Sequence, residues 1–349
     1  MSLDFGPLKT FFESDDITEI MVNSWNKIFV EHRGLLVETS AKFVDQRQFE
    51  ELVYSILSSD KKKLTASLSF DGILTTGDRY NITLPPLSVK GPALTIRKLS
   101  SRVLTLEDLV LSQFLSEKAA QFLKVAVESR LSLVVSGGTG SGKTSLLNTL
   151  GSLIPKSERI ITIEDVNELN INHPNWIQLQ SVQQDNLRIS TKESVINALR
   201  MRPDRIIVGE CRKDETFEML QAMNTGHDGS MTTIHANSSV DCLSRIESLV
   251  QLNGVDSPVR QVRFLISKAI DLIIQIRRRA DGRREIVDIT ELVGMEHETI
   301  TRAPLFERDK AGLLVTTGLV PNVLKKINMN GQVIPSSFFE NRTVPRRTA

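Results

Sequence analysis

The chain has 349 residues, of which 40% are hydrophobic and 24% charged, and its 43 Lys and Arg against 42 Asp and Glu leave a net charge of +1 at pH 7. The length exceeds what one hydrophobic core usually serves, so we expect two domains. The balanced charge excludes a global attraction to nucleic acid or anionic lipid, and no stretch approaches the roughly 18 consecutive apolar residues of a membrane span.

The N-terminal residues and the two cysteines bear on the cellular compartment. Residues 1–9 lack a basic segment followed by an apolar one, so we expect a cytoplasmic protein. Cys211 and Cys242 have no C-x-x-C or histidine-rich context. We therefore expect two buried free thiols instead of a disulfide or a metal site.

The first hundred residues predict a small α/β domain over 1–98. Phe49, Leu52, Val53, Ile56 and Leu57 follow the spacing of one face of an amphipathic helix. Turn residues separate the strand candidates, which lie at 17–22, 27–30, 35–39, 79–84 and 93–97. Ser100-Ser101-Arg102 marks a linker over 99–104.

A second domain is expected over 105–349. Thr105 begins a helix with Asp108 in the fourth position of a capping box. Helix and strand patterns then alternate, as a parallel sheet with crossover helices requires. The strand candidates lie at 131–135, 159–163, 176–180, 205–208 and 231–234. The helix candidates lie at 191–201, at 213–223 and from Ser238 or Ser239 toward Gly254.

Two strand candidates near the C-terminal end, 272–276 and 286–292, flank an Asp-Gly turn at Asp281-Gly282 and predict a hairpin. Five arginines gather at its tip: Arg277, Arg278, Arg279, Arg283 and Arg284. Contact with anionic lipid or a partner and a simple solvated tip both remain open for this cluster.

The stretch from Gly137 to Thr144, Gly-Gly-Thr-Gly-Ser-Gly-Lys-Thr, fits G-x-x-x-x-G-K-[ST] and lies between a strand and a helix pattern. Its glycines let backbone N–H groups surround a phosphate, Lys143 reaches the β- and γ-phosphates, and Thr144 ligates Mg²⁺. A plain glycine-rich turn is the weaker interpretation. The expected nucleotide-binding residues are Gly138, Thr139, Gly140, Ser141, Gly142, Lys143, Thr144 and Ser145.

Carboxylates follow two strand candidates of the same domain, where ligands of open α/β sheets bind. Glu210 comes after Gly209, a position suited to holding Mg²⁺ directly or through water. Glu164, Asp165 and Glu168 follow another strand, and one of them is expected to orient and deprotonate the attacking water. His235, after the strand at 231–234, is a candidate γ-phosphate sensor, although a satisfied core histidine is the commoner meaning of such a string.

Together these motifs resemble the secretion superfamily ATPases, the hexameric motors of type II and type IV secretion and of type IV pili. The resemblance rests on the phosphate loop, the acidic box 163–168, the segment 198–210 and the histidine box 226–237. The strings at 17–23 and 92–98 are most similar to the CpaF/TadA branch, which powers Tad (Flp) pili. The resemblance implies a RecA-like P-loop NTPase domain preceded by a small PAS-like α/β domain.

The same resemblance implies roles for particular residues. Glu210 matches the Walker B glutamate, and Glu168 the water-activating glutamate, with Glu164 as the second choice. His235 matches the histidine-box residue. Arg79 and Arg97 match N-terminal-domain arginines that reach the nucleotide in the hexamers. Arg200 matches the arginine that precedes Walker B. Residues 179–182 read Leu-Gln-Ser-Val where this family would have Leu-Glu-Thr-Arg.

The sequence thus predicts a Mg²⁺-dependent ATPase, homohexameric and cytoplasmic, docked on inner-membrane platform proteins without nucleic acid. The main hypothesis is a motor for assembly or retraction of Tad or type IV pili, or for protein secretion. The alternatives are a conjugative or type IV secretion ATPase, a RecA-like nucleic-acid translocase and a non-hydrolysing structural subunit. A translocase fits poorly with 5% aromatic residues and balanced charge.

Overall fold

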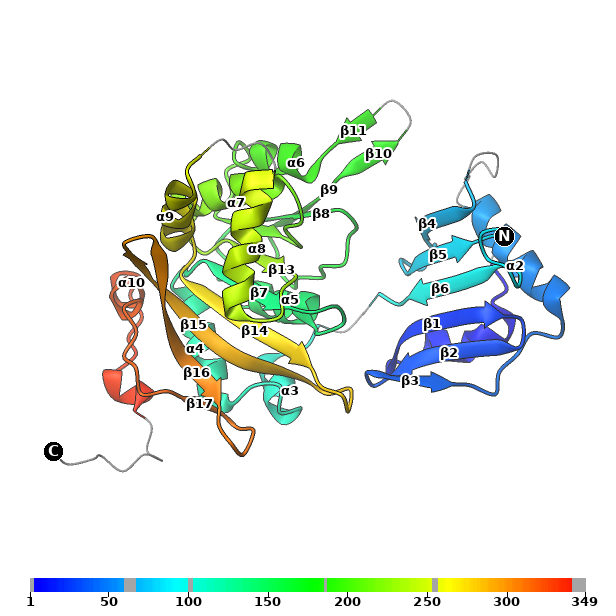
Figure 1. Ribbon diagram of the computed structural model, residues 1–349, viewed down its shortest axis with the longest axis horizontal. Helices are drawn as coiled ribbons and strands as arrows, with labels where there is room; N and C mark the ends of the chain where they lie inside the picture. Colours follow the sequence, from blue (N-terminus) through cyan, green and yellow to red (C-terminus); the bar gives the residue numbers. More distant parts are fainter. Residues whose placement is uncertain (1–2, 60–66, 100–102, 185–186, 253–256, 341–349) are drawn as a thin grey trace. The chain divides into compact units, whose positions relative to one another are not determined.

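The computed structural model describes residues 3–59, 67–99, 103–184, 187–252 and 257–340 (Figure 1). It divides into two compact units, one of residues 1–102 with 280–283 and one of residues 103–279 with 284–349. The expected linker residues Ser100, Ser101 and Arg102 lie outside the described residues. None of the described helices is long and apolar enough to cross a membrane.

The first unit is built on a six-stranded antiparallel sheet in the order β3-β2-β1-β6-β5-β4. Its strands are β1 (Ile17–Ser24), β2 (Lys27–His32), β3 (Leu35–Glu38), β4 (Ser69–Ile73), β5 (Arg79–Thr83) and β6 (Ala93–Arg97). Helix α2 (Gln46–Ser59) buries the five predicted apolar residues, so that prediction is confirmed. The sequence analysis did not predict η1 (Gly6–Leu8), α1 (Lys9–Glu13) or β4, whose interior glycine, Gly72, weakens its strand pattern.

The second unit contains a nine-stranded sheet in the order β17-β16-β15-β14-β7-β13-β12-β8-β9. The strands from β14 to β9 are parallel: β7 (Leu133–Gly137), β8 (Ile160–Glu164), β9 (Trp176–Gln180), β12 (Arg205–Val208), β13 (Met231–Ile234) and β14 (Leu272–Arg278). The other three strands, β15 (Arg284–Glu296), β16 (Thr299–Arg308) and β17 (Leu314–Thr316), continue it antiparallel. The sheet is therefore mixed, because hairpins and not helices connect these last strands, and the hairpin predicted from 272–276 and 286–292 is confirmed by the pairing of β14 with β15.

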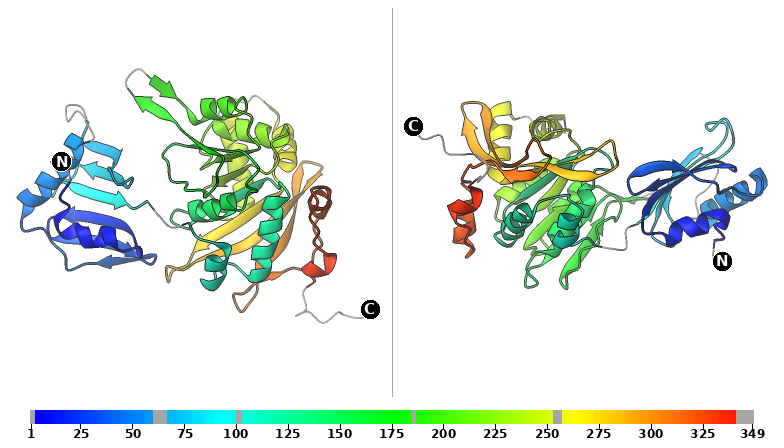
Figure 2. Two further views of the ribbon diagram at one scale, coloured as in Figure 1. Left: turned by 180° about the vertical axis from the view of Figure 1, so that it is seen from behind. Right: turned by 90° about the horizontal axis from the view of Figure 1, so that it is seen from below.

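Helices cover both faces of this sheet (Figure 2). Side chains alternate along a strand, so Leu133 and Val135 of β7 enter one core while Val134 enters the other. The first core packs against α3 (Leu106–Leu111), α4 (Glu117–Glu128) and α5 (Lys143–Ser152). The second packs against α6 (Thr191–Ala198), α7 (Glu215–Asn224), α8 (Ser239–Leu252) and α9 (Val259–Ala269).

The remaining short elements complete the second unit. A separate hairpin is formed by β10 (Val182–Gln184) and β11 (Leu187–Ile189). The C-terminal part contains α10 (Leu324–Met329) and η2 (Ser336–Phe339). The Phe339 ring lies 5.5 Å from that of Phe122 and 6.3 Å from that of Phe306, which fastens this segment to the first core.

Three further sequence predictions have clear outcomes. The capping box is confirmed, because Asp108 N–H donates to Thr105 Oγ1 at 3.1 Å and Thr105 N–H donates to Asp108 Oδ2 at 3.0 Å. The helix expected over 191–201 ends earlier, at Ala198, and Arg202 takes a left-handed φ of 54° before Pro203. Both cysteines are buried free thiols, as expected.

A fully buried arginine begins strand β12. The Arg205 guanidinium donates to both Glu158 oxygens, at 2.6 and 3.2 Å, and to the carbonyls of Gly229 and Val127, at 3.2 and 2.9 Å. Burial lowers the pKa of Arg205, and the bonds to Glu158 oppose that shift. Gly229 has a φ of +79°, and a Cβ there would collide with Arg205 Nη1. The arginine thus ties β12 to the segments before β8 and β13.

We expect Arg205→Met to lower the free energy of unfolding by about 3–5 kcal/mol, because it removes one partner of a buried ion pair. The midpoint of urea unfolding, followed by circular dichroism, measures the effect. Arg200→Met is the matched control, since Arg200 is exposed and its loss should change stability by no more than about 0.5 kcal/mol. Equal midpoints for the two variants would contradict the anchoring role.

The two thiols should not react in the folded protein. Burial raises the pKa of Cys211 and of Cys242 to about 12, so both stay neutral at pH 7–9, and only a thiolate attacks a disulfide reagent. We expect no release of thionitrobenzoate from Ellman's reagent in native conditions and two equivalents in guanidinium chloride. Rapid reaction of either thiol in the native protein would show that the structure opens around Cys211, in the loop after β12, or around Cys242, in α8.

Candidate active site

The parallel pairing of β7, β13, β12 and β8 brings the predicted site residues to one edge of the sheet. The phosphate loop follows β7, His235 follows β13, and Glu210 lies two residues after β12. Glu164 is the last residue of β8. Because these strands are adjacent and parallel, their carboxyl ends meet at the same edge, where ligands of open α/β sheets bind.

The phosphate loop has the backbone that anion binding requires. Gly140 and Gly142 have φ values of 67° and 98°, a region that favours glycine, and α5 begins at Lys143. The loop also leaves no room for a side chain at Gly137, where a Cβ would lie 2.6 Å from Ile276 Cγ1. Lys143 Nζ donates to the carbonyls of Gly137 and Gly138, at 2.9 and 3.0 Å, so its charge is held at the loop.

The two glutamates of the acidic box have different surroundings. Glu164 is only 5% exposed, and its Oε1 accepts from the backbone N–H groups of Glu168 and Leu169, each at 3.0 Å. Glu168 is partly exposed, and its Oε2 lies 3.5 Å from Thr144 Oγ1. Glu164 therefore holds the acidic segment in place, while Glu168 faces the hydroxyl expected to bind the metal.

The sequence analysis missed Arg212 and Glu215, which make hydrogen bonds beside Glu210. Arg212 Nη2 donates to Glu210 Oε2 at 2.6 Å, a hydrogen bond that raises the pKa of Arg212. Glu215 Oε1 accepts from the backbone N–H groups of Arg212, at 2.5 Å, and Lys213, at 2.8 Å. A Glu-x-Arg spacing at a strand end was the available signal, because alternate residues of an extended chain point the same way.

His235 is exposed at the end of β13. Two hydrogen bonds fix the backbone around it. Thr233 Oγ1 of β13 donates to the carbonyl of Gly209, after β12, at 2.7 Å. Gln275 Nε2 of β14 donates to the carbonyl of Ala236, after β13, at 3.3 Å. These bonds join β13 to the Glu210 side of the site and to β14. The imidazole thus projects from a fixed backbone beside the phosphate-loop strand.

The predicted arginines do not join this cluster within the second unit. Arg200 is exposed in the turn after α6, near Met201, whose carbonyl accepts from Arg159 at the amino end of β8. Arg200 therefore lies at the sheet edge opposite to the phosphate loop. Arg79 and Arg97 belong to the first unit, where they are directly paired across β5 and β6, and Arg97 Nη2 lies 2.8 Å from Glu19 Oε1.

The oxygen donors at this edge suit Mg²⁺. Thr144 offers a hydroxyl at the start of α5, and Glu168 and Glu210 offer carboxylates from two neighbouring strand ends. Hard oxygen ligands combined with substrate phosphates are the usual environment of this ion in phosphoryl-transfer sites. The residues present therefore fit a nucleotide with its magnesium ion.

Comparisons with known proteins agree with this arrangement. A family model described as "Type II/IV secretion system protein" matches residues 2–302. The chain is similar to a conjugal transfer protein TrbB from Rhizobium radiobacter, at 35% identity over 79% of this chain and 85% of that one. It is also similar to the type IV secretion system protein VirB11 from Bartonella henselae, at 31% identity over 81% and 90%. Among solved structures it resembles the pilus retraction motor PilT with bound ADP, with a TM-score of 0.59, 26% identity and 80% of each chain covered.

We expect Gly209→Ala to slow catalysis more than it weakens nucleotide binding. The added Cβ would lie 2.9 Å from Glu164 Cγ, so Glu164 must move, and with it the backbone that carries Glu168. A displacement of this kind should lower kcat by about tenfold to a hundredfold. Steady-state ATPase assays and titration with a fluorescent ADP separate the two effects. An unchanged kcat would show that Glu164 does not set the position of Glu168.

Proposed function

This chain belongs to the type II/IV secretion system ATPase family, and from that premise we propose that it is the ATPase of a conjugal-transfer or other type IV secretion machine. Membership makes the chain an NTP hydrolase with a nucleotide-binding site. The observation that carries the proposal is the convergence of the phosphate loop, Glu168 and Glu210 at one sheet edge. The names of the conjugal-transfer and type IV secretion relatives support the choice of machine.

This choice corrects our first hypothesis. The N-terminal strings favoured a Tad pilus motor of the CpaF/TadA branch, whereas the relatives named above carry conjugal-transfer and type IV secretion names at 31–35% identity. Short strings of strand residues are weak markers of a branch, because residues 17–23 and 92–98 lie on the paired strands β1 and β6 and reflect the packing of the N-terminal sheet. The conjugative alternative therefore becomes the main proposal.

In the proposed mechanism, backbone N–H groups of residues 138–145 surround the phosphates of ATP, and Lys143 shifts its three donors onto the β- and γ-phosphates. Thr144 and Glu210 would hold Mg²⁺, Glu210 directly or through water, and the ion would neutralise phosphate charge. Glu168 takes a proton from the attacking water, Glu164 keeps Glu168 in position, and His235 hydrogen-bonds the γ-phosphate. Arg212 holds the Glu210 carboxylate in a fixed orientation.

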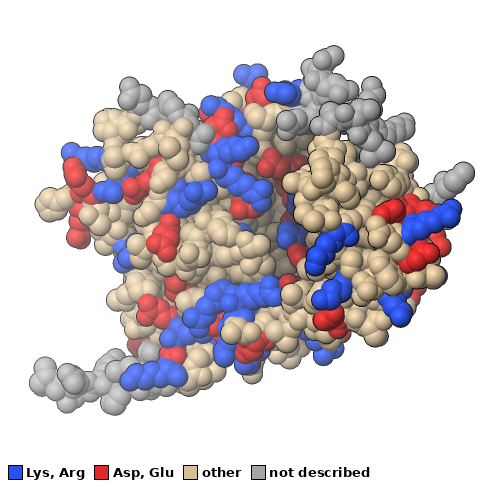
Figure 3. Space-filling view, turned by 45° about the vertical axis from the view of Figure 1, so that its right-hand side comes forward, with Lys and Arg blue, Asp and Glu red and all other residues tan. Residues whose placement is uncertain are grey.

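The arginines outside this cluster suggest how copies of the chain cooperate. Arg79, Arg97 and Arg200 do not meet the phosphate loop within the second unit, and a planar permanent charge supplied by another unit or copy would couple hydrolysis to movement. We therefore propose a cytoplasmic homohexamer that docks on inner-membrane platform proteins. Figure 3 shows charged side chains of both signs, and the balance of 43 Lys and Arg against 42 Asp and Glu in the chain supports a protein partner over nucleic acid.

We expect Glu168→Gln to lower kcat for ATP hydrolysis by at least about a hundredfold while nucleotide affinity stays within a few fold, because only the proton acceptor is lost. Lys143→Ala should weaken nucleotide binding itself. Glu296→Gln, an exposed glutamate at the end of β15, is the matched control and should behave as wild type. Measurements of turnover with and without Mg²⁺, together with oligomeric mass, test the proposal. Normal ATP turnover by Glu168→Gln would show that Glu168 is not the general base. A wild-type chain without Mg²⁺-dependent ATP turnover would contradict the proposed motor function.

A further inference from the structure

The hairpin of β14 and β15 carries the arginine cluster for which the sequence analysis kept two interpretations. Strand β14 pairs in parallel with β7, and their last pair joins Ile276 to Gly137. Beyond that pair β7 turns into the phosphate loop, while β14 continues for two residues to Arg278. Figure 1 shows β14 and β15 extending together at this end of the sheet. The C-terminal end of β14 therefore runs beside the phosphate loop.

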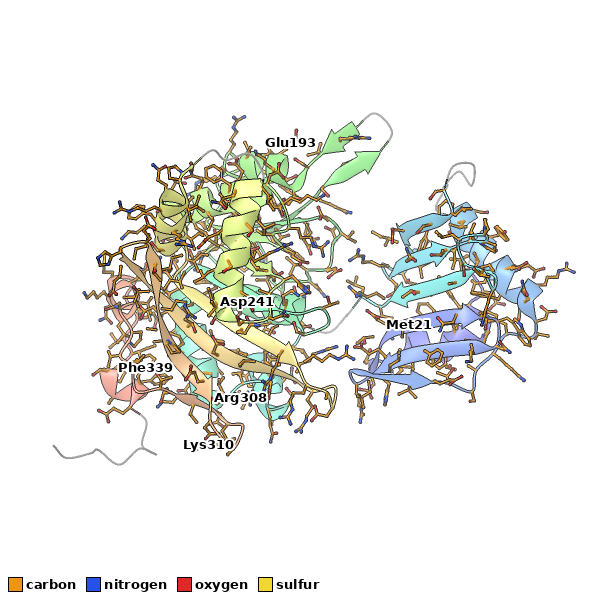
Figure 4. All side chains as sticks on the ribbon, in the orientation of Figure 1. Met21, Glu193, Asp241, Arg308, Lys310 and Phe339 are labelled. Atoms are coloured by element: carbon orange, nitrogen blue, oxygen red, sulfur yellow. The ribbon has the colours of Figure 1, made fainter. Side chains whose placement is uncertain are left out.

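Strand alternation sorts the arginines of the hairpin onto two faces. Arg277 and Arg279 share a face with Glu285, and both pair with its carboxylate, at 2.7 and 3.6 Å. Arg308 of β16, labelled in Figure 4, adds a third guanidinium 3.3 Å from the same carboxylate and donates to the Ile286 carbonyl at 2.7 Å. Glu285 is only 4% exposed, so these contacts fix the orientation of the hairpin.

The opposite face presents Arg278 and Arg284, which are directly paired across β14 and β15. Arg284 Nε donates to the Gly140 carbonyl of the phosphate loop at 2.9 Å. A Cβ on Gly140 would lie 3.2 Å from Arg278 Nη1, and a Cβ on Gly142 would lie 3.4 Å from Arg284 Cδ. Both guanidinium side chains therefore lie against the two left-handed glycines of the loop.

We propose that Arg278 and Arg284 act together as an arginine clamp, which holds the phosphate loop in its anion-binding conformation and adds positive charge beside the polyphosphate of the nucleotide. They are positioning residues that act through Gly140. This inference rests on the proposed function only in requiring a nucleotide at the loop. It assigns a purpose to the hairpin that neither the glycine pattern nor the acidic residues supply.

Elementary electrostatics supports the clamp. Coulomb attraction to a nearby cation stabilises a bound phosphate, and two guanidinium groups lie against this loop. The bond from Arg284 also orients the Gly140–Ser141 peptide: its carbonyl points to the arginine, and its N–H is then polarised as a stronger donor. A loop fixed in this way loses less conformational entropy when phosphate binds.

The experiment measures binding of a fluorescent ADP analogue to the full chain at low and moderate salt, for Arg284→Gln, Arg284→Lys, Arg278→Gln and the double Gln variant. Arg283→Gln is the matched control, because Arg283 belongs to the same hairpin but pairs with Asp281 at 2.7 Å. We expect Arg284→Gln to weaken binding by about tenfold or more through loss of a charge-assisted bond, with a smaller loss for Arg278→Gln. The control should bind within twofold of wild type.

Three readouts separate a clamp from a merely structural role. Arg284→Lys should recover part of the affinity, since the charge remains although the planar donor is lost. The salt dependence of binding should become shallower in the Gln variants, and the unfolding temperature should change little. The clamp is overturned if Arg284→Gln binds ADP within twofold of a wild type that hydrolyses ATP. A wild type that neither binds nor hydrolyses nucleotide would overturn the proposed function as well.

Discussion

Parallel pairing of β7 with β13 on one side and β14 on the other is the constraint on which the rest of this molecule depends. It places the phosphate loop between two strands whose ends carry His235 and the hairpin arginines. It also forces a close approach at Gly137, where the Ile276 side chain and backbone leave no space for a Cβ. The register of the sheet therefore decides which chemical groups face the nucleotide.

Much of the fold could be predicted from the sequence, because hydrophobic alternation, capping residues and the glycine pattern are local signals. Strands β9, β12 and β13 begin and end at the predicted residues, and α2 buries the predicted face. Element β4 and the antiparallel strands β16 and β17 were not predicted. All three pair with the strand next to them in the chain, so distant partners are not the reason. Their local patterns are weak, because β4 contains Gly72, β16 contains Pro304 and β17 has only three residues.

Some parts of the candidate site could be predicted from local sequence, and others depend on contacts between distant residues. The motif identified the phosphate loop and the carboxylates at the strand ends, since those signals are contiguous. Spacing alone could not separate Glu164 from Glu168, whereas burial and two backbone hydrogen bonds give Glu164 a supporting position. The contact between Arg284 and Gly140 spans 144 residues, and no local pattern contains it.

The end of the large sheet has a consequence for how copies of the chain associate. Strand β17 contains only three residues and borders the sheet on that side. These three residues offer few backbone donors and acceptors to a strand from another molecule, so extension of the sheet along β17 from copy to copy is disfavoured. Any contact between copies along β17 would depend on side-chain surfaces, which let subunits rotate against each other in a way that a continuous hydrogen-bonded ladder would prevent.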